Sequence, residues 1–177
     1  EIISLSSGEP DFDTPQHIKD HAIESINEGF TKYTQVDGIL ELKKSIKKKF
    51  TKENALKYGI DQITVGAGGK HVIYNLFMST LNKGDEVIIP APYWVSYPDI
   101  VSLCNGRPVI VKTKIENGFK ITPSQLEEKI SSRTKWFVLN SPCNPTGSIY
   151  TNVELKKLSE ILLKYTNVRI LSDDIYE

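Results

Sequence analysis

The residues of this chain that could do chemistry lie in four short loops, and each loop follows a predicted strand. The loops are GAGGK at 66–70, APYW at 91–94, SPCNPTG at 141–147 and DDIY at 173–176. In the first loop, Gly69 and Lys70 begin a predicted helix, where backbone amides suit a phosphate group. The loop is neither a P-loop nor a dinucleotide-binding turn, because Thr64 and His71 stand where those motifs require other residues. A phosphate-binding turn and a plain strand-to-helix turn therefore both stay open.

The other three loops carry an aromatic ring, a carboxamide and a carboxylate. Trp94 is either part of the core or a flat surface for a ligand. Asp173 ends an otherwise apolar strand, where a carboxylate either serves a function or caps its loop, and Tyr176 lies three residues on. Two prolines surround Asn144, and proline fixes φ and lacks an N–H group. This segment is therefore neither a helix interior nor a central strand, and it forms a stiff polar corner.

Other chemical patterns favour simpler interpretations. His17 and His21 have the spacing of two metal ligands on a helix, but no third ligand is apparent, so a solvated helix face is the better interpretation and we expect no metal site. The basic run KKSIKKKFTK at 43–52 includes Ile46 and Phe50 on an apolar side, which is typical of a surface helix. Lys plus Arg and Asp plus Glu each number 22, so the formal net charge is zero. This balance does not favour nucleic acid as a partner.

Composition places the chain among ordinary globular proteins, with 177 residues, 39% of them hydrophobic and 25% charged. Cys104 and Cys143 are far apart, which argues against a disulfide framework and favours the reducing cytoplasm. No apolar run reaches membrane-spanning length. The chain begins at Glu1 and its only methionine is Met78, so we expect a piece of a longer protein.

Strands alternate with helices in the hydrophobic pattern. Apolar spacing predicts helices at 15–28, around 39–50, at 69–82, within 93–104, at 122–130 and at 151–165. Strands are predicted at 62–65, 85–90, 107–113, 135–140 and 168–173. Capping boxes begin the helices after Thr122 and Thr151. Such alternation predicts a three-layer α/β/α fold with a mostly parallel sheet, whose ligands bind beyond the carboxyl ends of the strands. We therefore expect the four loops to meet at one edge of the sheet.

Six segments in this order resemble the class I aminotransferases, which are pyridoxal-phosphate (PLP) enzymes of the aspartate aminotransferase fold. They are SGEPDFDTP, KYTQVDG, GGKHVIYNLF, PYWVSYP, NSPCNPTG and SDDIYE. The likeness is greatest to the bacterial-type aspartate aminotransferases, some of which also accept prephenate. The resemblance implies an N-terminal segment and first helix at 1–30. Residues 31–177 would be part of the PLP-binding large domain of fold type I, without its C-terminal half and small domain.

The resemblance also implies how the cofactor is bound. Asp173 is expected to pair with the pyridine nitrogen, and Asn144 to donate to the phenolic oxygen that Tyr176 shares. Trp94 is expected to stack on the ring, and Gly69 and Lys70 to bind the phosphate. The resemblance further implies a cis peptide bond between Asn144 and the next proline.

Further roles follow from the same resemblance. Tyr33 is expected to reach the phosphate in a neighbouring subunit, which implies a homodimer with shared active sites. Gly8 is expected to contact the substrate carboxylate, Trp94 and Asn144 to line the substrate site, and Lys70 to lie near the distal carboxylate of an acidic substrate.

The family's catalytic Schiff-base lysine lies beyond the position of Glu177, and no lysine of this chain matches it. No catalytic residue is therefore assigned, and the chain alone is expected to be inactive. The resemblance implies transfer of the amino group of aspartate, or a similar amino acid, to 2-oxoglutarate or a related keto acid. Another PLP reaction on the same fold, such as an elimination, and a non-catalytic PLP-binding module stay as alternatives.

Overall fold

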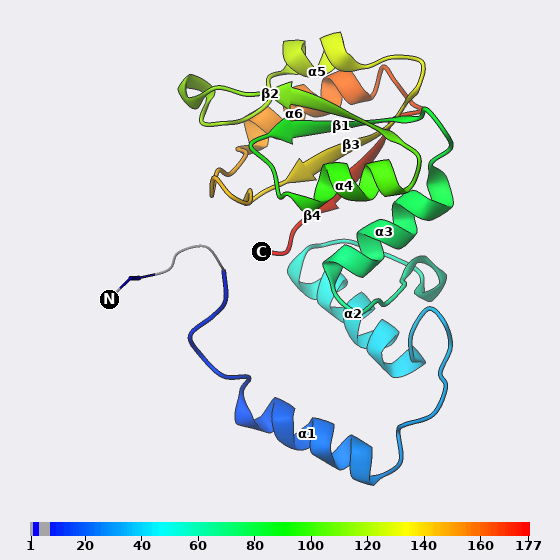
Figure 1. The fold of residues 1–177 in the computed structure, drawn as a ribbon. Coiled ribbons are helices and arrows are strands. Elements are labelled where there is room, and N and C mark those ends of the chain that lie inside the picture. Colours follow the sequence, from blue (N-terminus) through cyan, green and yellow to red (C-terminus); the bar gives the residue numbers. More distant parts are fainter. Residues whose placement is uncertain (1, 4–7) are drawn as a thin grey trace. The chain divides into compact units, whose positions relative to one another are not determined.

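The computed structural model describes residues 2–3 and 8–177, which form two compact units divided between Thr64 and Val65 (Figure 1). The first unit contains two helices, α1 (Gln16–Asn27) and α2 (Leu40–Glu53), and a short 3-10 helix, η1 (Ile60–Gln62). The second unit contains the sheet and the remaining helices. Across the described residues, no helix combines the length and the apolar character that crossing a membrane requires.

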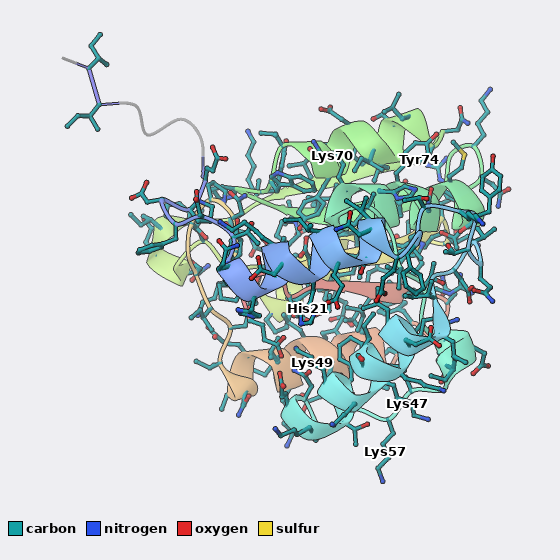
Figure 2. The ribbon with its side chains drawn as sticks, turned by 90° about the horizontal axis from the view of Figure 1, so that it is seen from below. His21, Lys47, Lys49, Lys57, Lys70 and Tyr74 are labelled. Carbon is teal, nitrogen blue, oxygen red and sulfur yellow. The ribbon has the colours of Figure 1, made fainter. Side chains whose placement is uncertain are left out.

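The helices of the first unit bury little of their apolar faces. In α1 no side chain is buried, and Ile18 and Ile26, on its predicted apolar face, are 49% and 63% exposed. In α2, Phe50 packs edge-on against Tyr58, with ring centroids 5.5 Å apart. The basic residues of this region are mostly solvated, as the sequence predicts, and Figure 2 shows Lys57 extending away from the ribbon. Lys43 is the exception, because it is buried and ion-paired with Asp37.

The strand predicted at 62–65 is wrong. Residues Ile60–Gln62 form η1, Ile63 is extended, and residues 63–66 belong to no strand of the sheet. A strand exists only where a neighbouring strand accepts and donates its backbone hydrogen bonds. No described segment pairs with residues 63–66, so β propensity alone does not make them a strand.

The second unit is built on a parallel four-stranded sheet. Its strands are β1 (Glu86–Ala91), β2 (Arg107–Lys112), β3 (Thr134–Asn140) and β4 (Arg169–Asp173), in the order β2-β1-β3-β4. Asn140 pairs in register with Asp173, and Ala91 with Lys112. The carboxyl ends of all four strands therefore lie at one edge of the sheet, as predicted.

Helices cover both faces of this sheet and complete three layers (Figure 1). On one face, α3 (Gly69–Thr80) and α4 (Ser96–Leu103) pack on a cluster that includes Phe77, Tyr97 and Trp136. On the other face, α5 (Pro123–Lys129) and α6 (Asn152–Leu162) pack on a second cluster around Phe137. Both capping boxes form as predicted, and a 3-10 turn, η2 (Ile115–Asn117), precedes α5. The fold class predicted from the sequence is confirmed.

Three prolines of the carboxyl-edge loops follow cis peptide bonds. The Asn144–Pro145 bond is cis, as the resemblance implies. The Ala91–Pro92 and Ser141–Pro142 bonds are also cis, which the sequence did not indicate.

Candidate active site

Asp173 is the last residue of β4, and both oxygens of its carboxylate have neighbouring hydrogen-bond donors. The phenol of Tyr97 donates a hydrogen bond of 2.5 Å to Asp173 Oδ2, while the backbone N–H of Ile175 lies 3.4 Å from Oδ1. Tyr97 is 1% exposed, and burial together with the Asp173 bond raises its phenolic pKa far above the ordinary value. Tyr97 therefore stays protonated and acts as a hydrogen-bond donor to Asp173.

Asn144 and Tyr176 come from different loops and meet at the same edge. The Asn144 Nδ2 amide lies 3.4 Å from the Tyr176 hydroxyl. An amide N–H and a phenol that converge in this way can both donate to one ligand oxygen that carries negative charge.

Asn140 joins the two loops that carry these groups. Its Nδ2 donates to the backbone carbonyl of Asp173 at 2.9 Å, and its Oδ1 accepts from the backbone N–H of Asn144 at 2.8 Å. The loop after β3 is closed further by hydrogen bonds between Cys143 and Ser148 and between Gly147 and Cys143. One carboxamide thus fixes Asn144 relative to Asp173.

Trp94 stands between the end of β1 and the start of α4. Its ring meets Tyr97 edge-on, with centroids 5.3 Å apart and planes at 84°. Lys70 Nζ lies over the Trp94 ring, 5.2 Å from its centroid. This contact brings the first turn of α3 to the same edge of the sheet as Trp94 and Asp173.

The glycine turn before α3 has an open backbone. Gly68 adopts a φ of +86°, which favours glycine, and neither Gly68 nor Gly69 has an atom within 4 Å of the place a Cβ would take. The side chain of His71 accepts a hydrogen bond of 3.0 Å from the backbone N–H of Ala67. The turn is thereby held in shape. Residues 67–70 are exposed, so an anion can approach the first turn of the helix.

The two remaining predicted residues, Gly8 and Tyr33, belong to the first unit. Both are exposed, and the roles that the resemblance implies for them stay predictions. His17 and His21 are exposed on α1, and the described residues contain no group of three or more side chains suited to a metal ion.

Tyr97 and Asn140 were missed by the sequence analysis. Tyr97 lies on a helix in an apolar segment, which is typical of a core aromatic residue. Its spacing of three residues from Trp94, about one helical turn, was the available signal. Asn140 is the last residue of an apolar strand, and a carboxamide in that place signals a hydrogen-bond role at the loop.

These elements define a class of protein, an α/β/α domain with four chemical groups in the loops at the carboxyl edge of its sheet. The groups are a hydrogen-bonded carboxylate, an amide–phenol pair, an indole and a glycine turn, from Asp173, Asn144 with Tyr176, Trp94, and Gly68 with Gly69. The sequence profile of the family "Aminotransferase class I and II" matches residues 1–177. The chain belongs to the class I and II aminotransferase family.

Individual relatives agree with this assignment. The chain is 60% identical over 176 residues to a probable aspartate/prephenate aminotransferase of Rickettsia typhi, covering 99% of this chain and 44% of that protein. It is 49% identical to the crystal structure of the aspartate aminotransferase of Rhizobium meliloti, with a TM-score of 0.94 over 96% of this chain and 42% of that one. An aspartate aminotransferase of Thermus thermophilus with maleate is 42% identical, with a TM-score of 0.91 over 96% and 44%. The chain thus spans less than half the length of these relatives.

Proposed function

We propose that the full-length protein is a PLP-dependent aminotransferase that takes the amino group from aspartate or a similar amino acid. The observation that carries this proposal is the placement of the Asp173 carboxylate. It stands at the end of β4, hydrogen-bonded by the buried Tyr97 and tied through Asn140 to the loop of Asn144. Membership of the aminotransferase family supports the same activity.

The donor set suits each polar group of PLP. A carboxylate such as Asp173 can keep a pyridine nitrogen protonated, and Asn144 and Tyr176 can donate to a phenolate oxygen. The backbone amides of Gly69 and Lys70, two exposed residues in the first turn of α3, can bind the phosphate. PLP when bound supplies the electron sink for carbanion chemistry. The residues of this chain orient it, and Trp94 offers an aromatic surface for its ring.

Lys70 supports an acidic amino acid as the substrate. Its ammonium group lies over the Trp94 ring and forms no ion pair with a carboxylate of the described residues. A distal carboxylate of aspartate would supply that charge partner. The relatives named for aspartate, and the Thermus thermophilus structure with the dicarboxylate maleate, favour the same class of substrate. As amino acceptor we propose 2-oxoglutarate or a related keto acid, with prephenate suggested by the Rickettsia typhi relative's name.

A homodimer with shared sites is part of this proposal. The exposed apolar side chains of the first unit support it, because such surface favours burial in an interface. They include Ile18, Ile23, Ile26 and Phe30. Tyr33 is fully exposed and would act in the neighbouring subunit's site, while Gly8 would contact the substrate carboxylate through its backbone. The covalent lysine is expected outside residues 1–177, and the cytoplasmic location stays a prediction.

The test is to purify the full-length protein and measure its PLP content and its reactions with aspartate. We expect bound PLP, and oxaloacetate formed in an amount equal to the glutamate made from 2-oxoglutarate. Release of ammonia without glutamate would instead favour the elimination alternative. Bound PLP without turnover of any amino acid would favour the non-catalytic module, and failure to bind PLP would overturn the proposal.

A further inference from the structure

Tyr97 contacts two of the residues proposed to meet the cofactor ring. Its hydroxyl bonds Asp173 and its ring packs edge-on against Trp94. Its backbone N–H also donates to the Trp94 carbonyl at 3.1 Å. A single buried side chain therefore links the carboxylate at the end of β4 to the indole that follows β1.

The position of Tyr97 is set by the core and not by solvent. Tyr97 occupies the first turn of α4 and is 1% exposed, within the cluster that includes Ile89, Val138 and Leu171. Close packing of this kind restricts the side chain, so its hydroxyl is held near one position. Asp173, by contrast, is a half-exposed residue at a strand end, where its carboxylate could otherwise rotate.

The hydrogen bond removes that freedom. With Oδ2 engaged by the phenol, Oδ1 is the oxygen left for a second strong partner, because its contact with the Ile175 N–H is long at 3.4 Å. A charge-assisted hydrogen bond depends on alignment as well as distance, so a carboxylate held in one orientation is a better partner for a ring N–H.

We propose that Tyr97 is the positioning residue that orients Asp173 toward the pyridine nitrogen of PLP and keeps that nitrogen protonated. The inference rests on the proposed function, because it requires PLP at this edge. Tyr97 is not a catalytic residue, since it acts through Asp173 and transfers no proton itself. Losing its hydroxyl should weaken the alignment of Asp173 and leave the edge-on packing of the ring in place.

The test uses the full-length protein with Tyr97→Phe and PLP labelled with nitrogen-15 in its ring. The nitrogen-15 chemical shift reports ring protonation directly, and it is followed against pH. In wild type we expect the ring nitrogen to be protonated. In Tyr97→Phe, the pH at which half of the ring nitrogen is deprotonated, the midpoint, should be about one unit lower than in wild type. The dissociation constant of PLP should rise about tenfold. An unchanged or higher midpoint in the variant would overturn the proposal.

Tyr150→Phe is the matched control. Tyr150 is also a buried tyrosine, and its hydroxyl accepts one hydrogen bond, from the Ile121 backbone N–H. It belongs to the cluster on the other face of the sheet. This variant should leave the nitrogen-15 midpoint where wild type has it. An equal shift in both variants would mean a general structural effect and would overturn the specific role of Tyr97.

Failure of the proposed function has a different signature. If wild type binds no PLP, the function itself fails before Tyr97 is tested. If wild type binds PLP with a protonated nitrogen and Tyr97→Phe behaves identically, the inference about Tyr97 alone fails. If Tyr97→Phe does not fold, the Tyr97 hydroxyl proton in wild type is measured by NMR, and its resonance must move when PLP binds. A resonance that stays in place would contradict the proposal.

Discussion

Replacing Asn140 with alanine should damage both stability and cofactor binding. The change removes two hydrogen bonds, one of 2.9 Å to the Asp173 carbonyl and one of 2.8 Å from the Asn144 N–H. Neutral hydrogen bonds of this kind contribute about 0.5–1.5 kcal/mol each, so the loss in the free energy of unfolding should be about 1–3 kcal/mol. Because Asn140 is half-exposed, water can take the place of the lost hydrogen-bond partners in part, which favours the lower end of this range.

Cofactor affinity should fall as well, because Asn140 fixes the loop of Asn144 relative to Asp173. If about 1.4 kcal/mol of the lost energy is expressed in binding, the dissociation constant of PLP rises about tenfold. Urea unfolding of the full-length protein measures the first effect, and equilibrium dialysis with PLP measures the second.

Asn167→Ala provides the control at the opposite end of the same strands. Asn167 Nδ2 donates one hydrogen bond of 3.2 Å to the carbonyl of Thr134, the first residue of β3. Its removal should cost about 0.5–1.5 kcal/mol of stability and leave PLP affinity unchanged. The reasoning fails if Asn140→Ala binds PLP as tightly as Asn167→Ala does.

Three further predictions concern the site and the stability of the second unit. Asp173→Asn in the full-length protein should retain some PLP but lose most transamination, because a carboxamide cannot hold a ring nitrogen protonated; near-normal turnover would point to Asp174 instead. Lys70→Ala should reduce the rate with aspartate more than the rate with alanine, and an equal loss with both substrates would remove the selectivity role. The pKa of Glu154 is lowered from 4.5 to about 2, first by Lys120 and then by the Thr151 N–H. A lowered carboxyl pKa stabilises the folded state above the ordinary pKa and loses that effect as pH falls, so the stability difference between wild type and Glu154→Gln should shrink between about pH 4.5 and pH 2. Denaturant unfolding across that range checks the trend, and a difference independent of pH would contradict it.

The sheet was the most predictable part of the fold. The segments for β1 to β4 are short apolar runs bounded by turn residues, and their predicted ranges agree closely with those observed. Parallel pairing then follows from the helices between them, and it places Trp94, Asn144 and Asp173 beyond one edge without any knowledge of side-chain contacts.

What the sequence could not predict depends on partners far away in the chain. Residues 62–65 have strand-like composition, yet pairing decides whether a strand forms, and composition carries no information about the neighbour. Ile18 and Ile26 lie on one face of α1 as their spacing indicates, but spacing does not tell whether that face is buried, and both side chains are exposed.

The bonds that Tyr97 and Asn140 make are set by tertiary register. Tyr97 reaches Asp173 across 76 positions of sequence, and Asn140 reaches it across 33. Local sequence therefore indicated which loops matter, and the three-dimensional structure was needed to find what holds them in place.

The strand order has a consequence for how this site is assembled during synthesis. β1 and β2 follow each other and can pair early, and β3 then adds to the free side of β1. Among the described strands, β4, which carries Asp173, pairs with β3 alone, and it is the last of the four to leave the ribosome. We therefore expect a nascent chain to fold most of its sheet before it can close the Tyr97–Asp173 and Asn140–Asp173 hydrogen bonds. Hydrogen exchange on ribosome-arrested chains would detect this order, and protection of β4 before β1 would exclude it.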